Sequence, residues 1–559
     1  METRRYILAI GLSMLVLVVY LRFFGPQPPQ QPAGQQPAPQ EQQAPEAPKQ
    51  AEPVKPLPAG TAAKIAAASA GRSIAVETDL YHAAVNTAGG VITKWELLDY
   101  READKEAVGV GPFFRRLMSG EKKAERPKKP LGNVELFTSY EGVRPDDIVA
   151  PLTVTPTDKE LARVAAVEYH ASAESVRLDR DRSTQTLTLT YSGPGGIQIE
   201  KKLTFHNNSY AVDVAIDTKG LDGYSLALGT DFGMSDKVSS NASGRVGIAA
   251  LVDNKLVQEK SDSIKGEARQ SGAISWFGQE DKYFTAALID GGAAGVITTK
   301  RTAAPKEIGD LLDTELLVKE GAGSRTFTLY AGPKKLDILK SFGKGLEQMV
   351  DYGWFGVLAR PMFWLMEQFF AITRNYGIAI ILLTIVVRAL LFYPSLKSAR
   401  AMEEMKALQP QMNALREKYK KDPQKMNAEI MRLYKEHKVN PLGGCLPMLL
   451  QLPFFVALYN VLSVSIELRQ SPFLSFWIKD LSVHDPFYIL PVLMGVSMVA
   501  TMKMTSTTVD PQQQKMMMFM NIAFIFLFAW LPAGLLLYIT LSNVLSIAQQ
   551  LYVRKLLAK

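Results

Sequence analysis

The sequence is poor in cysteine and histidine, and it lacks the short motifs of several common enzyme classes. Its single cysteine, Cys445, excludes an intramolecular disulfide. We find no GxxxxGKS/T, HExxH or GxSxG pattern, which argues against P-loop nucleotide hydrolysis, HExxH zinc proteolysis and nucleophile-elbow acyl transfer. Three of the five histidines, His82, His170 and His206, lie in one β-rich region, and their spacing assigns them no catalytic role.

Acidic residues are missing from the apolar run that contains Arg388 and from the three apolar runs that follow it. Hydrophobic residues make up 47% of the 559 positions, yet the mean hydropathy is only +0.01, so apolar segments must be offset by long polar ones. This length leaves room for two to four domains.

Positive charge is in excess, with a net charge of +8 and a pI of about 9.1. Such values are typical of nucleic-acid-binding proteins, but also of membrane proteins with basic cytoplasmic loops. The basic residues gather in loops between apolar runs, which favours the membrane. We therefore expect contact with membrane lipid and no specific nucleic acid recognition.

The N-terminal region predicts a membrane anchor followed by a linker. Residues 1–25 contain an apolar run after Arg4-Arg5 that is long enough to span a bilayer. The alternative is a cleaved signal peptide, but Leu21 to Pro26 offers no small-x-small cleavage site. We interpret the run as an uncleaved signal anchor. Residues 26–71, rich in Pro, Gln and Ala, are predicted to form a disordered tether.

Residues 72–340 are predicted to form a large all-β domain. Thr184–Tyr191 and Ala211–Asp217 alternate apolar and polar residues with period two. Gly-Gly and Asn-Asn pairs, such as Gly89-Gly90 and Asn207-Asn208, punctuate such runs. Many short strands over this length favour an antiparallel sandwich.

Residues 341–375 are predicted to be a linker and an amphipathic helix that lies in the outer membrane interface. The segment from Trp354 to Phe370 is rich in aromatic residues. Arg360, Pro361 and Glu367 argue against a membrane crossing there.

Five further apolar runs predict membrane spans, and with the N-terminal anchor they make six crossings: 376–394, 441–466, 486–503, 516–531 and 535–551. Several have only about 16 to 18 residues, which implies tilt or local thinning of the bilayer. Pro532-Ala533-Gly534 is a tight turn, so the last two runs are expected to form a hairpin.

The distribution of Lys and Arg sets the expected topology. Residues 395–440 are strongly basic and the C-terminal tail, 552–559, is basic too, whereas 467–485 contains few basic residues. The positive-inside rule then places both termini, 395–440 and the short loop 504–515 in the cytoplasm. Residues 26–350 are expected outside, in the periplasm.

The basic loop 395–440 is predicted to be a helical hairpin. Asp422-Pro423 supplies an N-cap and a first-turn proline for its second helix, which should run to about His437. Its first helix is indicated by apolar residues at helical spacing, namely Ala401, Met405, Leu408, Met412, Leu415 and Tyr419.

Arg388 is an isolated cation in an apolar helix, with Thr384 one turn earlier on the same face. Because a guanidinium stays charged, it needs water, a counter-charge or a route to the headgroups. Two interpretations stay open. Arg388 lies roughly 8 Å from the segment end, so its side chain can reach the headgroups. Alternatively it lies in a wet cavity that is the functional site.

Several motifs resemble those of the YidC membrane protein insertases of the Oxa superfamily. The match covers nearly the whole chain and is weakest in the tether and the β domain. The stretches that carry it are Asn440 to Pro447, Gln451 to Tyr459, Arg388 before Tyr393-Pro394, Leu468 to Phe473, Asp485 to Pro491, Gln512 to Met516 and Pro532 to Tyr538, with Asn86 to Gly90, Trp276 and Tyr283 to Ala287 in the β domain.

The resemblance implies a multi-pass α-helical protein of the bacterial inner membrane with six transmembrane helices. Five of them would form an insertase core around a hydrophilic groove, open to the cytoplasm and to lipid, and the periplasmic domain would be an all-β supersandwich. The protein would insert, fold and help to assemble inner-membrane proteins without nucleotide hydrolysis. It would not be an enzyme and would need no cofactor or metal.

By position, the resemblance assigns seven residues to the substrate-binding groove: Arg388, Thr384, Gln451, Leu452, Phe455, Leu527 and Tyr538. The implied partners are nascent membrane proteins, the Sec translocon and the translating ribosome. The tail 552–559 is short compared with the long basic extension of some relatives, so ribosome binding through the tail is not expected.

Two other classes of function are weighed against insertion. A secondary transporter should show internal repeats and broken helices, and we see no convincing repeat. A membrane-anchored sugar-modifying enzyme needs acid and base residues in the β domain. Methionines cluster between Met494 and Met520 and are interpreted mainly as packing or lipid-facing residues. Asn543, Ser546 and Gln550 share one face of the last helix and are expected to bond neighbouring helices.

Overall fold

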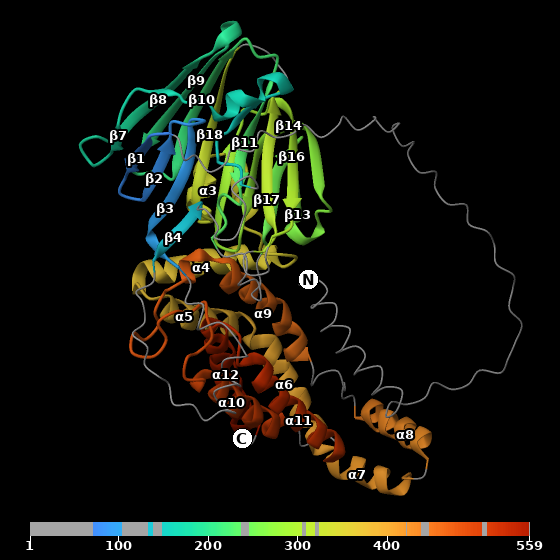
Figure 1. Cartoon of the computed structure of the whole chain (residues 1–559). Coiled ribbons are helices and arrows are strands. Elements are labelled where there is room, and N and C mark those ends of the chain that lie inside the picture. Colours follow the sequence, from blue (N-terminus) through green and yellow to red (C-terminus); the bar gives the residue numbers. More distant parts are fainter. Residues whose placement is uncertain are drawn as a thin grey trace, which may run out of the picture.

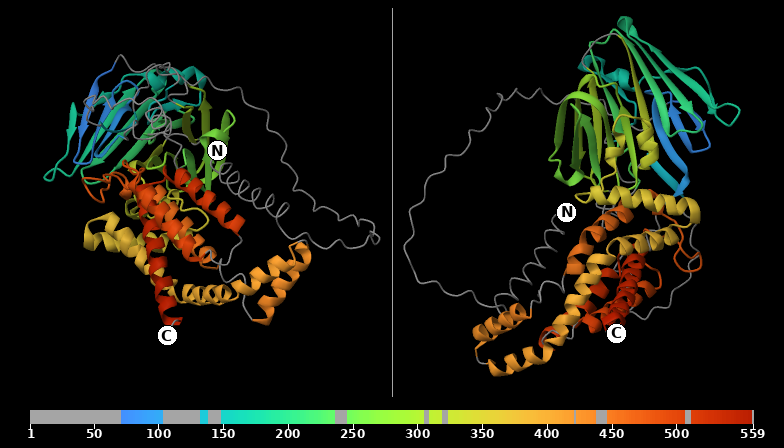
Figure 2. Two further views of the ribbon diagram at one scale, coloured as in Figure 1. Left: turned by 90° about the horizontal axis from the view of Figure 1, so that it is seen from below. Right: turned by 180° about the vertical axis from the view of Figure 1, so that it is seen from behind.

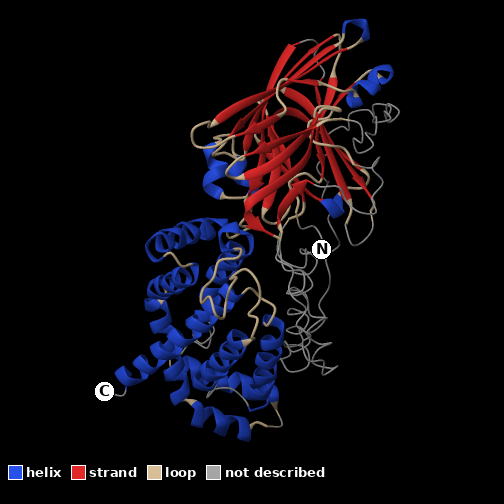
Figure 3. Ribbon diagram, turned by 60° about the vertical axis from the view of Figure 1, so that its left-hand side comes forward, coloured by secondary structure: helices blue, strands red, loops and turns tan. Residues whose placement is uncertain are grey.

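The computed structural model describes residues 71–102, 132–137, 148–235, 245–304, 309–318, 323–420, 422–437, 446–505 and 511–557. These residues form a β-sheet domain and a helical domain that are stacked end to end (Figure 1). Coloured by secondary structure, nearly all strands lie in one half and the long helices in the other (Figure 3). The predicted anchor, residues 1–25, lies outside the described residues, and so does the linker up to residue 70.

The β domain contains eighteen strands among its described residues. They are β1 (Ser73–Glu77), β2 (Tyr81–Asn86), β3 (Val91–Arg101), β4 (Asn133–Phe137), β5 (Val154–Pro156), β6 (His170–Ala171), β7 (Ser175–Arg177), β8 (Thr184–Ser192), β9 (Gln198–His206), β10 (Ala211–Lys219), β11 (Tyr224–Thr230), β12 (Gly247–Val252), β13 (Lys255–Lys260), β14 (Glu267–Glu280), β15 (Phe284–Ile289), β16 (Ala294–Thr302), β17 (Leu311–Val318) and β18 (Gly323–Pro333).

Two sheets make up this domain. The smaller has the order β4-β3-β2-β1-β7. The larger follows β5-β11-β17-β16-β14-β15-β18-β10-β9-β8-β6, and in addition β12 pairs with β14 and β13 pairs with β12. The pairing is antiparallel except between β1 and β7. The two predicted strands are confirmed as β8 and β10, because their alternation buries one face of each. The β-rich prediction for residues 72–340 therefore holds.

Aromatic side chains and one lysine fill the space between the sheets. Trp95 is fully buried and stacks on Tyr81, with ring centroids 4.1 Å apart. Lys201 on β9 is also fully buried, and its Nζ donates to the carbonyls of Gly89, Gly90 and Leu152 at 2.7, 3.1 and 2.8 Å. The ammonium thereby ties the larger sheet to the turn between β2 and β3.

The helices of the second half are α3 (Leu336–Ser341), α4 (Gly356–Thr373), α5 (Tyr376–Leu390), α6 (Phe392–Ala407), α7 (Gln409–Lys418), α8 (Pro423–Glu436), α9 (Leu446–Val464), α10 (Ile489–Thr505), α11 (Pro511–Phe528) and α12 (Ala533–Leu557). Helix α4 runs crosswise between the β domain and the other helices (Figures 1 and 2). It is amphipathic: Met362 and Met366 are buried, whereas Trp364 and Ile372 are exposed. The interfacial placement stays a prediction.

Few of the described helices are long and apolar enough to span a membrane. Ala533–Val553 is long and apolar enough to cross a bilayer, and the bent pair Tyr376–Leu390 with Phe392–Ser398 makes a second if it counts as one span. Leu450–Val464, Ile489–Met504 and Met518–Phe528 are shorter apolar helices. The count of six crossings therefore stays a prediction.

Several helix boundaries differ from those predicted from the apolar runs. The run 376–394 is broken near Leu391, where the chain bends by 57° between α5 and α6. Pro394 does not end the helix, because in the first turn of α6 its missing N–H breaks no hydrogen bond. Helix α12 packs mainly against α10 and α5, so the last two runs do not form the close hairpin that was expected.

The predicted helical hairpin projects from the other helices as α7 and α8 (Figure 2). Asp422 caps α8 as predicted, accepting from the N–H of Lys425. The first helix is divided at Leu408, because Pro410 falls in the first turn of α7. Met405, Leu408, Met412, Leu433 and Tyr434 form the small core of the hairpin.

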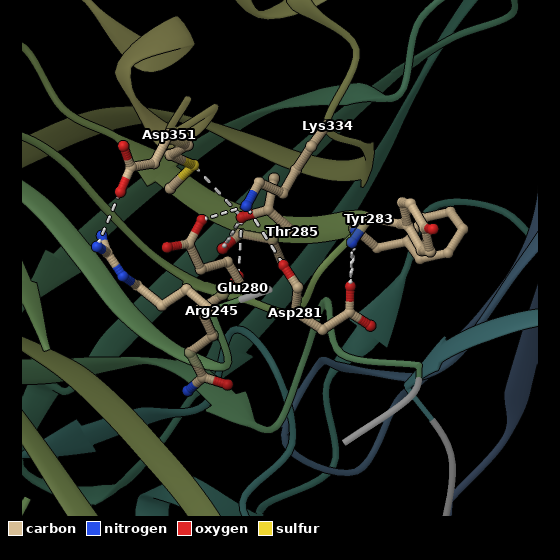
Figure 4. Close-up of polar contacts among 11 residues, drawn as sticks. Arg245, Glu280, Asp281, Tyr283, Thr285, Lys334 and Asp351 are labelled. Atoms are coloured by element: carbon tan, nitrogen blue, oxygen red, sulfur yellow. Dashed lines mark hydrogen bonds and ion pairs between the residues drawn. The ribbon is translucent and has the colours of Figure 1, made fainter. Parts of the chain in front are cut away.

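The turn of the β domain that carries Tyr283 and Phe284 is held by a network of polar groups within that domain. The carboxylate of Asp281 accepts from the backbone N–H groups of both residues, at 2.8 and 2.7 Å. Lys334 pairs with buried Glu280 at 2.7 Å and donates to the carbonyl of Asp281 (Figure 4). These bonds fix the turn between β14 and β15 that faces the helices.

Arg469, in the connection between α9 and α10, lies against that turn. Its guanidinium carbon is 5.6 Å from the ring centroid of Tyr283 and 5.2 Å from that of Phe284. Gln470 donates to the carbonyls of Arg101 and Glu102 at the end of β3. The β domain is therefore docked directly onto the connection that follows α9.

Candidate functional site

Arg388 lies in the last turn of α5 and points toward α12. Its side chain is partly buried, and Nη2 donates to the main-chain carbonyl of Ser542 at 2.6 Å. The guanidinium is therefore held between helices rather than extended along its own helix. This contact joins the isolated cation to α12.

Thr384 is completely buried one turn before Arg388. Its hydroxyl donates to the carbonyl of Ile380 at 2.6 Å, which uses the proton on its own helix. Among the seven predicted site residues, Thr384 is thus placed near the arginine but without an exposed polar group. Its contribution is to the packing of α5.

Tyr538 on α12 joins Arg388 to Gln451 on α9. The Tyr538 side chain is 1% exposed. Its hydroxyl interacts with the Gln451 side chain and with the charge of Arg388. Helix α12 packs against α5 and α9, which brings these three predicted residues into one polar cluster. Three helices that are distant in the sequence therefore contribute to it.

The apolar members of the predicted set are placed differently. Phe455 is half-buried and packs against the central core, whereas Leu452, beside Gln451, is 53% exposed. Leu527 is 62% exposed on α11, a helix that packs against α10. The place of Leu527 on an opposing groove wall stays a prediction.

The structure adds one residue that the sequence did not single out. Ser542 is 1% exposed, lies one helical turn after Tyr538 and provides the carbonyl that binds Arg388. The spacing of four between Tyr538 and Ser542 was the available signal, because it places both on one face of a helix. A serine in an apolar helix has no other distinguishing mark.

Acidic residues are absent from five of the described apolar helices, whereas α4 contains Glu367 and α6 contains Glu403 and Glu404. The sequences of α5, α9, α10, α11 and α12 contain no Asp or Glu. Asn543, on another face of α12, donates to the Ser497 hydroxyl at 3.0 Å, so the predicted role of Asn543 as an interhelical bond is confirmed. The arrangement can bind an anionic or hydrogen-bond-accepting group, and it contains no acid–base pair for bond cleavage.

Comparison with known proteins covers both halves of the chain. A family model described as 60Kd inner membrane protein matches residues 368–559, and one described as YidC periplasmic domain matches residues 122–365. The membrane protein insertase YidC of Geobacter metallireducens is 35% identical over 570 residues, which cover 99% of each chain. This chain belongs to the YidC family of membrane protein insertases.

A second curated relative agrees with this assignment. The YidC insertase of Geobacter sulfurreducens is 40% identical over 66% of this chain and 70% of its own length. A crystal structure of an active YidC insertase with its first transmembrane domain resolved aligns over 86% of this chain and 92% of its own, at 19% identity and a TM-score of 0.37. The predicted membership of the long YidC form, with a periplasmic domain, is confirmed.

Proposed function

We propose that this protein inserts membrane proteins into the bacterial inner membrane through a groove that contains Arg388. The closely matching relatives are named as membrane protein insertases, and the family model names an inner membrane protein. The observation that carries the proposal is the Arg388 guanidinium, which is held between two apolar helices, α5 and α12, that contain no Asp or Glu. The protein would act without hydrolysing nucleotide.

The physical task is to lower the barrier for a polar peptide segment. Hydrocarbon about 30 Å thick is prohibitive for such a segment because each unpaired polar group costs several kcal/mol. A wet groove that reaches part of the way shortens the apolar path. A fixed positive charge within it attracts acidic residues of the entering segment. The apolar helix of the substrate then moves sideways into lipid, which drives insertion.

The proposed topology has six crossings, with both termini and residues 395–440 in the cytoplasm and residues 26–350 in the periplasm. The groove residues are proposed to be Arg388, Gln451 and Tyr538 at the polar cluster, Thr384 beneath it, and Leu452, Phe455 and Leu527 as apolar walls. The exposed faces of Leu452 and Leu527 suit contact with an apolar substrate helix. The Sec translocon and the translating ribosome are proposed partners.

Photocrosslinking during synthesis of a small membrane protein tests this proposal. A crosslinking residue at Gln451 or Tyr538 is expected to capture the nascent chain. The matched control is Val496, which is 63% exposed on α10 and is not one of the predicted groove residues. Capture at Val496 but not at Gln451 or Tyr538 would show that substrates take another route.

Substitution of Arg388 tests the role of its charge. Arg388→Ala is expected to slow insertion of a substrate with an acidic tail by at least about tenfold, because a charge pair at about 4 Å gains a few kcal/mol at intermediate dielectric. Arg388→Lys should retain much of the activity, since a cation rather than a planar fork is needed. Normal insertion by Arg388→Ala would remove Arg388 from the mechanism.

A further inference from the structure

Arg469 is held against the β domain by two aromatic rings. Its guanidinium carbon lies 5.6 Å from the ring centroid of Tyr283 and 5.2 Å from that of Phe284, within the range of a cation–π interaction. Its Nη1 atom is buried and makes no hydrogen bond within the described part of the chain. Tyr283 and Phe284, the aromatic pair, therefore contribute directly to holding the cation in place.

The aromatic pair is fixed within the β domain. The Asp281 carboxylate accepts from the backbone N–H groups of both residues (Figure 4). Phe284 is 1% exposed, and Tyr100 meets it edge-on, with ring centroids 5.5 Å apart and an interplanar angle of 87°. The β domain therefore offers a rigid surface, and the connection that carries Arg469 must conform to it.

The backbone beside Arg469 is strained where it meets the β domain. Gln470 has a φ of 58°, in the left-handed region that residues other than glycine seldom adopt. Its side-chain amide donates to the carbonyls of Arg101 and Glu102, at 3.2 and 3.4 Å. Such a conformation persists only where the surrounding structure holds it. Docking onto the β domain thus fixes two consecutive residues of the connection.

These two residues follow almost directly from α9. A single 3-10 turn, Ile466–Leu468, separates them from the Val464 end of that helix, and both its end residues are buried. The rest of the connection bonds the neighbouring ends of α5 and α12. Asn375 donates to the Phe473 carbonyl, and the N–H of Ala533 donates to the Val483 carbonyl. The β domain therefore holds a connection that joins the ends of three helices.

A small tilt of α9 is enough to disturb the polar cluster. Gln451 lies roughly 20 Å from the Val464 end of α9 at the helical rise per residue. A tilt of about 5° about that end displaces Gln451 by roughly 2 Å. Gln451 interacts with the Tyr538 hydroxyl, and a hydrogen bond is lost over such a displacement.

We propose that Arg469 is a positioning residue for insertion. Through its contact with the aromatic pair, the β domain sets the tilt of α9 and keeps Gln451 beside Tyr538 in the groove. Arg469 acts through α9 rather than by touching the substrate. This inference rests on the proposed function and gives the β domain a part in it.

Photocrosslinking in the full-length protein tests this role during synthesis of a small membrane protein. The crosslinking residue is placed at Gln451 or, in a separate protein, at Tyr538, and the ratio of the two captures is measured. Arg469→Met should lower the ratio about fivefold, the effect of losing a cation–π contact. Arg469→Lys should retain most of it, because lysine keeps the cation. Lys479→Met, at an exposed position in the same connection, should leave it unchanged.

A double-mutant cycle tests whether Arg469 acts through the aromatic pair. Tyr283→Leu should also lower the capture ratio, since it removes one of the two rings. The double variant Arg469→Met/Tyr283→Leu should be no lower than Arg469→Met alone, because the ring has no cation left to hold. Two effects that multiply in the double variant would refute the coupling.

Two further outcomes would overturn the positioning role. A wild-type ratio in Arg469→Met would show that α9 takes its place without the β domain. Equal loss of capture at Gln451 and Tyr538 would indicate a general loss of structure instead of a shift of α9. Capture at neither position in the unsubstituted protein would refute the proposed function itself, a result distinct from both.

Discussion

Lys201 offers a sharp test of the β domain, because its ammonium is buried between the two sheets. The nitrogen donates to three backbone carbonyls and lies 5.0 Å from the ring centroid of Tyr169. Burial lowers the pKa of Lys201 from 10.5 to about 7. Lys201→Met removes the titrating group with little change in side-chain length, and it leaves the carbonyls of Gly89, Gly90 and Leu152 without their donor.

The sign and size of the pH effect follow from the two pKa values. The unfolded chain binds the proton more tightly, so between about pH 7 and about pH 10.5 unfolding takes up a proton and the free energy of unfolding rises with pH. With the lysine half-protonated at about pH 7, the gain is about 2 kcal/mol by about pH 9. Lys201→Met lacks this gain. At every pH, its free energy of unfolding is also lowered by about 1–3 kcal/mol for each carbonyl left unbonded.

Pulse proteolysis in urea measures the free energy of unfolding of the β domain in the full-length protein. The difference between wild type and Lys201→Met should grow in favour of the wild type by about 2 kcal/mol from about pH 7 to about pH 9. Lys202→Met is the control, because Lys202 is adjacent on β9 but points outward. A difference that does not vary with pH would refute the assignment of Lys201 as a buried, readily discharged lysine.

Two further predictions concern the junction and the groove wall. Arg469→Met should raise amide hydrogen exchange in residues 465–471 about tenfold, because the stacking of the guanidinium on Tyr283 and Phe284 is lost. The control is Lys479→Met, at an exposed position in the same connection. Equal exchange in both variants would rule out docking through Arg469. Leu527→Ala should change the free energy of unfolding by less than about 0.5 kcal/mol, because the side chain is 62% exposed, and a loss above about 2 kcal/mol would place it in a packed core instead.

The strands were predictable where alternation is local. β8 and β10 each bury one face, so apolar and polar residues alternate along their sequences with period two. Sheet order was not predictable, because β5 pairs with β11 and β1 with β7 across long intervals of sequence. Such pairings depend on side-chain packing between distant segments, which no local pattern records.

Helix boundaries were predictable at caps and misjudged at prolines. Asp422 caps α8 because its side chain meets a free backbone N–H, which is a local property. Pro394 was predicted to end its apolar run, and the first helix of the hairpin was predicted from residues 401 to 419 without a break. Pro394 and Pro410 instead fall in first turns of helices, where proline is tolerated. Whether a proline falls at the end of one helix or in the first turn of the next depends on where the chain bends. The packing of α5 against α12 is a long-range contact that the local sequence does not show.

Some residues of the candidate site could be predicted from the sequence and others could not. Arg388 stands out from sequence because a permanent charge in an apolar run is costly wherever the run lies. Ser542 does not, because a serine becomes significant only when a guanidinium from another helix reaches its carbonyl. Gln451 and Tyr538 came from family resemblance, and the structure brings both to the arginine through α9 and α12.

The two ends of the helical domain are held together unequally. At the end that carries the β domain, Asn375 bonds the Phe473 carbonyl, Asn460 bonds the Tyr352 carbonyl, and Tyr376 stacks on Phe370 with ring centroids 3.8 Å apart. Asp485 accepts from Trp477 and from the N–H of Leu490 and so fixes the start of α10.

Toward the opposite end, the described contacts between α12 and the α5–α6 region include the Arg388–Ser542 bond and a hydrogen bond from Gln549 to the Phe392 carbonyl. Both are made to main-chain carbonyls, and an anionic acceptor would compete with the Ser542 carbonyl for the guanidinium. The proposed groove needs this asymmetry: we predict that the docked end resists separation and that the end beyond Arg388 is the one that opens.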